Sequence, residues 1–183
     1  MRIAIASSLI LLLIGLAQPA SADLFAFEVQ GQAGFSQVGN LKLPGAADES
    51  GKLGGFAFGA RGRVQVLFLT AMLDYQHFLD GADLVYGGLG VQFSTDLLPV
   101  VRPYVCGSLG LMLLAADAKA FSPDAPEKMT TEAGGYARAG GGLEIPFAGD
   151  FLAFGVSANV GVHYLTGQVG YDFDVMGYLG LRI

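Results

Sequence analysis

Eight stretches of this chain alternate apolar with polar residues at a period of two, as in RPYVCGSLG, which begins at Arg102. Successive side chains of a β-strand point to opposite sides of the sheet, so the alternation predicts strands with one apolar and one polar face. The predicted strands cover residues 24–36, 54–66, 68–78, 84–94, 101–114, 134–147, 151–165 and 171–183. No turn residues mark the boundary between the second and the third. The pattern predicts an all-β fold.

The first 22 residues have a different character. Arg2 gives a positive start, residues 3–16 carry no charge, and the small residues at 20–22 form a cleavage site. The apolar run is shorter than the about 20 residues that a membrane-spanning helix needs. We therefore expect residues 1–22 to be a cleaved secretory signal peptide and residues 23–183 to form a single domain.

The exported part is unusually apolar. Of the whole chain, 52% of residues are hydrophobic and 14% are charged, yet no run after residue 22 could form a spanning helix. The lone cysteine, Cys106, excludes an internal disulfide framework. Loss of Arg2 changes the formal net charge from −6 to −7, which argues against nucleic acid as a partner. In lipid, such a chain satisfies its backbone only as a closed barrel, so we predict an eight-stranded antiparallel up-and-down transmembrane β-barrel.

The connections between the predicted strands fall into two kinds. Residues 37–53 and 115–133 form long polar connections, at the end of the barrel opposite to both termini. Residues 96–100 and 148–150 form short connections at the end that carries the termini. Short inner turns and longer outer loops are typical of outer-membrane barrels. We therefore expect 37–53 and 115–133 to be outer loops.

The distribution of basic residues indicates which face is enclosed. After the signal peptide, all five arginines fall on the polar face of a predicted strand, whereas all four lysines (Lys42, Lys52, Lys119 and Lys128) fall in the two long connections. Arginine suits enclosed carboxylate pairs better than the strongly hydrated lysine does. The expected interior charge network consists of Glu28, Arg61, Arg63, Asp74, Arg102, Arg138, Glu144, Asp174 and Arg182. The apolar face would then meet lipid, with aromatic residues near the strand ends forming girdles. A soluble lipocalin-like barrel with the two faces exchanged remains an alternative.

Three motifs resemble those of small outer-membrane β-barrel proteins. Arg102-Pro103-Tyr104-Val105 with the following Gly107 and Gly110, the segment Gly140–Glu144, and the C-terminal MGYLGLRI resemble strands of that family. The resemblance is to the transmembrane domain of outer-membrane protein A and to related porin-family and opacity-type barrels. It implies that the C-terminal segment is read by the barrel-assembly machinery, although Ile183 stands where the family prefers phenylalanine. Unlike full-length outer-membrane protein A, this chain is expected to have no peptidoglycan-binding domain after the barrel.

The sequence predicts no catalytic, cofactor-binding or metal site. His77 and His163 lack the His-Ser pair of lipid A deacylases, and we expect His163 to lie inside the barrel near Asp174 or Glu144. The glycine clusters lack the Lys-Ser/Thr of a phosphate-binding loop, and close strand packing accounts for them. Cys106 is interpreted as a small interior residue.

The expected function is that of a non-catalytic, monomeric integral protein of the outer membrane. Its role would be structural or in surface interaction through residues 37–53 and 115–133. Its partners would be outer-membrane lipid, lipopolysaccharide and the barrel-assembly machinery, while the sequence identifies no ligand for the loops. The alternatives are a narrow pore and a lipid A-modifying enzyme, besides the lipocalin-like barrel.

Overall fold

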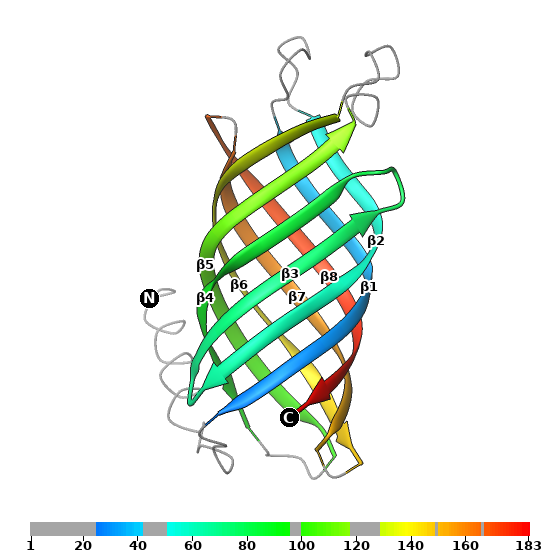
Figure 1. The fold of residues 1–183 in the computed structure, drawn as a ribbon, viewed down its shortest axis with the longest axis vertical. Coiled ribbons are helices and arrows are strands. Elements are labelled where there is room, and N and C mark those ends of the chain that lie inside the picture. The colour runs from blue at the N-terminus through cyan, green and yellow to red at the C-terminus, as the bar shows by residue number, and fades with distance from the viewer. Residues whose placement is uncertain (1–24, 42–50, 96–99, 118–128, 149, 166) are drawn as a thin grey trace, which may run out of the picture.

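The computed structural model describes residues 25–41, 51–95, 100–117, 129–148, 150–165 and 167–183 of the chain. The signal peptide expected at residues 1–22 lies outside these ranges. Eight strands form one closed barrel in which each strand pairs with the next, antiparallel throughout, and β8 closes on β1 (Figure 1). The strands are β1 Ala26–Leu41, β2 Gly51–Val66, β3 Leu69–Phe78, β4 Asp83–Ser94, β5 Arg102–Asp117, β6 Met129–Phe147, β7 Leu152–Leu165 and β8 Gln168–Arg182. Within the described ranges, no helix is long and apolar enough to cross a membrane.

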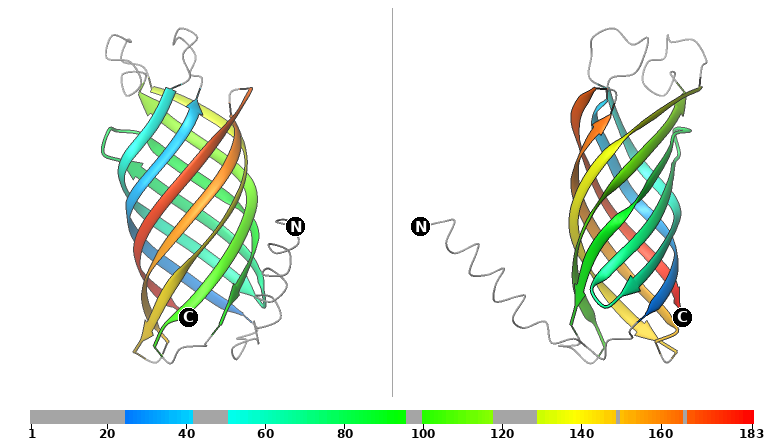
Figure 2. Two further views of the ribbon diagram at one scale, coloured as in Figure 1. Left: turned by 180° about the vertical axis from the view of Figure 1, so that it is seen from behind. Right: turned by 60° about the vertical axis from the view of Figure 1, so that its left-hand side comes forward.

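The strands are strongly tilted against the barrel axis, as Figure 2 shows from two sides. The tilt follows from the register, because paired residues traced once around the barrel lead from Ala26 back to β1 at Val38, an advance of 12 residues (38 − 26). Strand number, tilt and this stagger together set the diameter of a barrel. The large stagger widens the interior and makes room there for bulky polar side chains.

Each of the eight predicted strands is present, but several extend further than predicted. β1 continues to Leu41, β2 already begins at Gly51, and β5 and β6 extend to Asp117 and back to Met129. The expected loops 37–53 and 115–133 are therefore partly strand, and residues 42–50 and 118–128 between them lie outside the described ranges. Lys52, expected in a loop, lies in β2 with an exposed side chain. Polar residues did not end these strands, because ladder pairing such as that of Gln37 with Gly54 and of Gly39 with Lys52 continues through them.

The turn that the sequence left unmarked consists of Leu67 and Phe68. Leu67 adopts a φ of 56°, the left-handed region that favours glycine, asparagine or aspartate. A leucine there carries no turn signal, which is why sequence patterns gave no boundary between β2 and β3.

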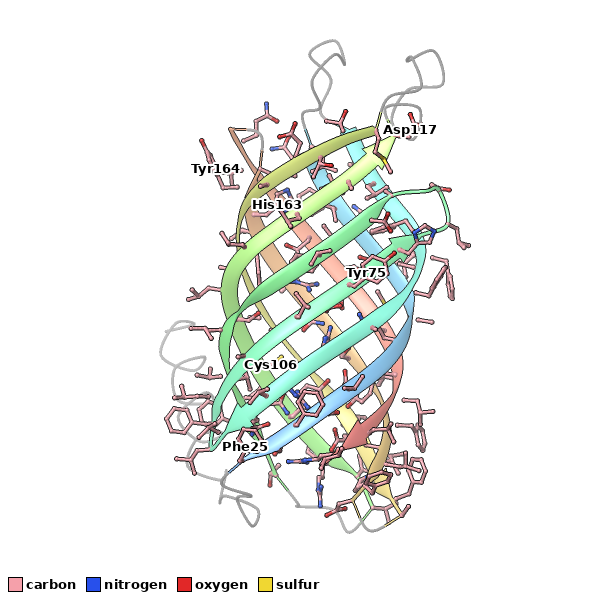
Figure 3. All side chains as sticks on the ribbon, in the orientation of Figure 1. Phe25, Tyr75, Cys106, Asp117, His163 and Tyr164 are labelled. Carbon is pink, nitrogen blue, oxygen red and sulfur yellow. The ribbon has the colours of Figure 1, made fainter. Side chains whose placement is uncertain are left out.

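The two faces of the wall are oriented as predicted. The outward face is apolar, with Leu109 67% and Leu111 72% exposed, whereas Arg61 and Arg138 are buried inside. This orientation rules out the lipocalin-like alternative with an apolar interior and outward arginines. Exposed aromatic side chains lie near both ends, including Phe25 at one end and Tyr164 at the other (Figure 3). We call the end that holds the C-terminus and the β2–β3 and β6–β7 turns the inner end, and the opposite end the outer end.

Candidate functional site: the barrel interior

The interior has two parts of different chemistry. From the inner end to about mid-height, the inward side chains are mostly charged or amide-bearing. Near the outer end most of them are apolar and form a cluster that we call the outer plug, beside which the buried His163 and Asp172 also lie. The outer plug consists of Val38, Leu41, Leu53, Ala57, Phe78, Ala82, Leu84, Met112, Leu114, Ala116 and Leu165. The alternation in the sequence predicted a polar interior, and the outer plug corrects this prediction at the outer end.

The first ion pair of the polar part joins neighbouring strands. Arg61 on β2 is the register partner of Asp74 on β3, and its Nε and Nη2 lie 3.0 and 2.6 Å from Asp74 Oδ2. Gln32 Nε2 donates to the other carboxylate oxygen of Asp74 at 2.5 Å. The Asp74 side chain is 0% exposed. Such a buried carboxylate is stable only when it is both paired and hydrogen-bonded, as it is here.

A second pair lies nearer the inner end. Arg63 contacts Glu28 on β1 through Nη2 and the amide oxygen of Gln92 on β4 through Nη1. Gln30 Nε2 donates to the second oxygen of Glu28 at 2.6 Å. One guanidinium thus joins side chains of β1, β2 and β4 across the interior.

The third cluster centres on Arg138 and joins β6 to β8. Arg138 Nε lies 2.6 Å from Asp172 Oδ1, and Nη2 contacts Asp174. Asn159 Nδ2 donates to Asp174 Oδ1 at 2.7 Å. The guanidinium carbon lies 4.4 Å from the centre of the Tyr86 ring, a cation–π contact. Asp172 was missed in the sequence, although it stands two residues before Asp174 and therefore on the same face.

The remaining predicted charges lie at the inner rim and are more loosely paired. Arg102 Nη2 contacts Asp150 of the β6–β7 turn at 2.9 Å, and the Asp150 side chain is 57% exposed. Arg182 Nη1 lies 3.9 Å from Glu144 Oε1, and Tyr178 donates to Glu144 Oε2 at 3.4 Å. Glu144 is itself buried, but Arg102 and Arg182 are partly exposed, so we call these three residues the rim set and the other six predicted residues the enclosed set.

The two histidines occupy different environments. His163 is fully buried, and its Nδ1 lies 3.8 Å from Asp172 Oδ2, so its nearest acid is neither Asp174 nor Glu144 as expected. His77 lies on the outward face near the outer end, with Nδ1 2.8 Å from Asp83 Oδ1. Tyr75 donates to the same oxygen at 2.7 Å. The described residues contain no group of three or more His, Cys, Asp or Glu side chains placed to bind a metal ion.

A small cavity lies in the polar part, below the outer plug. Its volume of about 30 Å³ is enough for one or two water molecules. Its lining includes Arg61, Arg63, Arg138, Asn159, Ser108 and Cys106. Cys106 is thus an interior residue, as the sequence predicted.

Glycines on the inward face let aromatic rings lie flat against the wall. A Cβ at Gly88 would stand 2.6 Å from Tyr136 Oη, and one at Gly142 would stand 2.7 Å from Tyr104 Oη. These glycines permit close packing, the role that the sequence analysis gave to the glycine clusters.

Comparisons with known proteins identify the fold. No family model matches the chain, and no curated protein matches its sequence. Among solved structures, the barrel is similar to Neisserial surface protein A, at a TM-score of 0.59 and 14% identity over 86% of this chain and 97% of that one. It also matches the N-terminal barrel domain of Pseudomonas aeruginosa OprF, with a TM-score of 0.47 and 15% identity over 85% of this chain and 97% of that one. The similarity to the Neisserial protein establishes the fold of an outer-membrane β-barrel, as the motifs in the sequence indicated.

Proposed function

We propose that this chain is a non-catalytic integral protein of the outer membrane, exported through residues 1–22, with residues 23–183 as its barrel domain. Its role is structural or in surface interaction, through the segments at the outer end around residues 37–53 and 115–133. The fold match to a protein named as a surface protein supports this assignment. The barrel is a monomer that contacts lipid and lipopolysaccharide, and the barrel-assembly machinery inserts it.

The outer plug is the observation that carries this proposal. Phe78, Leu84 and Leu114 are each at most 1% exposed, and they come from three consecutive strands. Below them the guanidinium groups are held by carboxylates rather than left facing an open passage. An eight-stranded barrel has an interior that side chains just fill. These contacts favour a closed scaffold over the alternative of a narrow pore.

The contacts of the histidines argue against the second alternative, a lipid A-modifying enzyme. Hydrolysis with a serine nucleophile needs a histidine within hydrogen-bond reach of that hydroxyl. The polar contacts of His77 and His163 are with the carboxylates of Asp83 and Asp172. Lipid A recovered from cells that overproduce the protein should therefore be unchanged in mass.

Two measurements test the proposal. In planar lipid bilayers the purified barrel should give no stable single-channel steps under conditions in which a porin does, and stable ion-selective currents would overturn it in favour of a pore. Protease added to intact cells should cleave after Lys119 or Lys128. Cleavage only after the outer membrane is permeabilised would refute the orientation.

A further inference from the structure

The turn between β2 and β3 has an unusual surface for the end of a hairpin. Val66, Leu67, Phe68 and Leu69 are consecutive, uncharged and 45–56% exposed. The β6–β7 turn, four strands away around the barrel, instead carries Asp150, whose carboxylate pairs with Arg102. Figure 1 shows that the β2–β3 turn also ends short of the β6–β7 turn along the barrel axis, and both views in Figure 2 agree.

The apolar turn is continuous with the outward apolar face. The Phe68 ring stacks on Phe93 of β4, with ring centres 5.8 Å apart and planes 11° from parallel. Val91 and Leu89 continue the exposed apolar surface along β4 towards mid-height. The turn therefore extends the same surface that meets lipid.

The carbonyl groups of the turn are satisfied from within the protein. Phe68 O accepts a hydrogen bond from Gln92 N at 2.8 Å, and Leu67 O accepts one from Gln65 Nε2 at 2.7 Å. Irregular backbone exposed to hydrocarbon is tolerated only when its polar groups have such internal partners. A turn in water would not need them.

The length of β3 also indicates that the turn contributes to the apolar band. β3 has 10 residues, fewer than any other strand, whereas β6 has 19. At a tilt near 45°, ten residues rise about 23 Å, slightly less than the about 25 Å apolar band of such barrels. On this side the band is completed only by the turn residues, Leu67 and Phe68 at the inner end and the 67% exposed Leu79 at the outer end.

We propose that the β2–β3 turn is immersed in the hydrocarbon of the inner leaflet and does not project into water. Its ligand is lipid acyl chain, and the barrel stands asymmetrically in the bilayer, with the β3 side submerged and the β6 side projecting. The inference rests on the proposed membrane location of the barrel.

The left-handed conformation of Leu67 supplies a test with opposite signs. In a turn exposed to water, Leu67→Asn relieves the backbone strain and raises the urea midpoint of the barrel in vesicles. In an immersed turn it places an amide in hydrocarbon and lowers the midpoint, which is the result we expect. Ala148→Asn is the matched control, because Ala148 has a φ of 53° in the exposed β6–β7 turn, and its midpoint should stay or rise. A rise with both variants would overturn the proposal.

A depth measurement covers the case in which Leu67→Asn does not fold. The chain contains no tryptophan, so Phe68→Trp introduces a single reporter. With lipids brominated on the acyl chains, its fluorescence should be quenched nearly as strongly as that of Leu109→Trp and far more than that of Lys52→Trp at the outer end. Quenching no stronger than that of Lys52→Trp, or blue-shifted but unquenched emission from a turn covered by protein, would overturn the proposal. Failure of Leu109→Trp itself to be quenched would instead refute the membrane location.

Discussion

The inner and outer parts of the barrel interior are both filled by side chains, but the inner part uses ion pairs and the outer part mainly apolar contacts. In the inner part, guanidinium groups contact carboxylates from other strands or from a turn, as Arg61 contacts Asp74 and Arg102 contacts Asp150. In the outer part, apolar side chains such as Phe78, Leu84 and Leu114 fill most of the interior, beside the buried Asp172 and His163. The ion pairs of the inner part fix the relative positions of the strands, because the planar guanidinium donates hydrogen bonds in only a few directions. The outer part gains a seal, because an apolar cluster offers water and ions no polar partner.

Substitutions in the two parts should also destabilise the barrel through different mechanisms. Removing one member of a buried pair strands a charge, whereas truncating an apolar side chain leaves a cavity. Variants in the two parts should therefore differ in size of effect and in what rescues them.

The largest effect is expected for Asp74→Asn in the inner part. The new amide oxygen would still accept a hydrogen bond from Gln32, but Arg61 would lose its counter-charge while buried, at a cost of about 3–5 kcal/mol. Urea unfolding in lipid vesicles measures it. The double variant Arg61→Met/Asp74→Asn removes the stranded charge and should recover much of the stability. A double variant as unstable as the single one would show that the charge is not the cause.

Leu84→Ala tests how closely the outer plug is packed. Leu84 is 0% exposed, and its truncation should cost about 2–5 kcal/mol through lost contacts and a cavity. Leu89→Ala on the same strand is the matched control, because Leu89 is 66% exposed on the outward face, where lipid can fill the space. Equal losses for the two variants would contradict a packed outer plug.

Leu109→Arg tests whether the outward face of the barrel, unlike both parts of the interior, meets hydrocarbon. An arginine near mid-height on the lipid face of a barrel costs about 2–4 kcal/mol. Leu109→Phe, which keeps the position apolar, should fold normally into vesicles. Tolerance of Leu109→Arg would mean that this face does not meet hydrocarbon.

Glu144→Gln should have a smaller effect than Asp74→Asn. Its contact with Arg182 Nη1 is long, at 3.9 Å, and Arg182 is partly exposed, so we expect a loss of about 1 kcal/mol. The unfolding midpoint should fall slightly, and no large conductance should appear. A loss equal to that of Asp74→Asn would contradict the weaker pairing that we assign to Glu144.

Asp150→Ala should have the smallest effect. Its pair with Arg102 lies at the exposed inner rim, where such pairs contribute about 0–1 kcal/mol. High salt should reduce even this contribution. A larger loss, insensitive to salt, would show that the rim set is as enclosed as the Arg61 and Arg138 clusters.

The sequence predicted the wall better than it predicted what fills the interior. Alternation located all eight strands because one face of each had to be apolar. It failed where both faces are apolar, as at Leu109–Ala116, where Met112 and Leu114 point inward although the run contains no polar residue. The outer plug was missed for that reason.

Which carboxylate pairs with which arginine depends on the register of neighbouring strands, and the alternation of polar and apolar residues does not specify that register. The separation of arginine from lysine indicated which face was enclosed, and the structure buries Arg61 and Arg138 there. Asp150 was missed as the partner of Arg102 because it belongs to a turn rather than to a strand face. The β2–β3 boundary was missed because Leu67 adopts a conformation that leucine does not signal.

The reactivity of Cys106 tests most directly whether the outer plug seals the interior. Cys106 is the only cysteine of the chain and lines the cavity below the plug. A small charged methanethiosulfonate reagent is added to intact cells, and labelling is compared with that of Cys106→Ser/Lys52→Cys, which reports the outer end. We predict prompt labelling of the Lys52→Cys reporter and no labelling of native Cys106 until the barrel is unfolded. Labelling of Cys106 in the folded barrel at the rate of the reporter would contradict it.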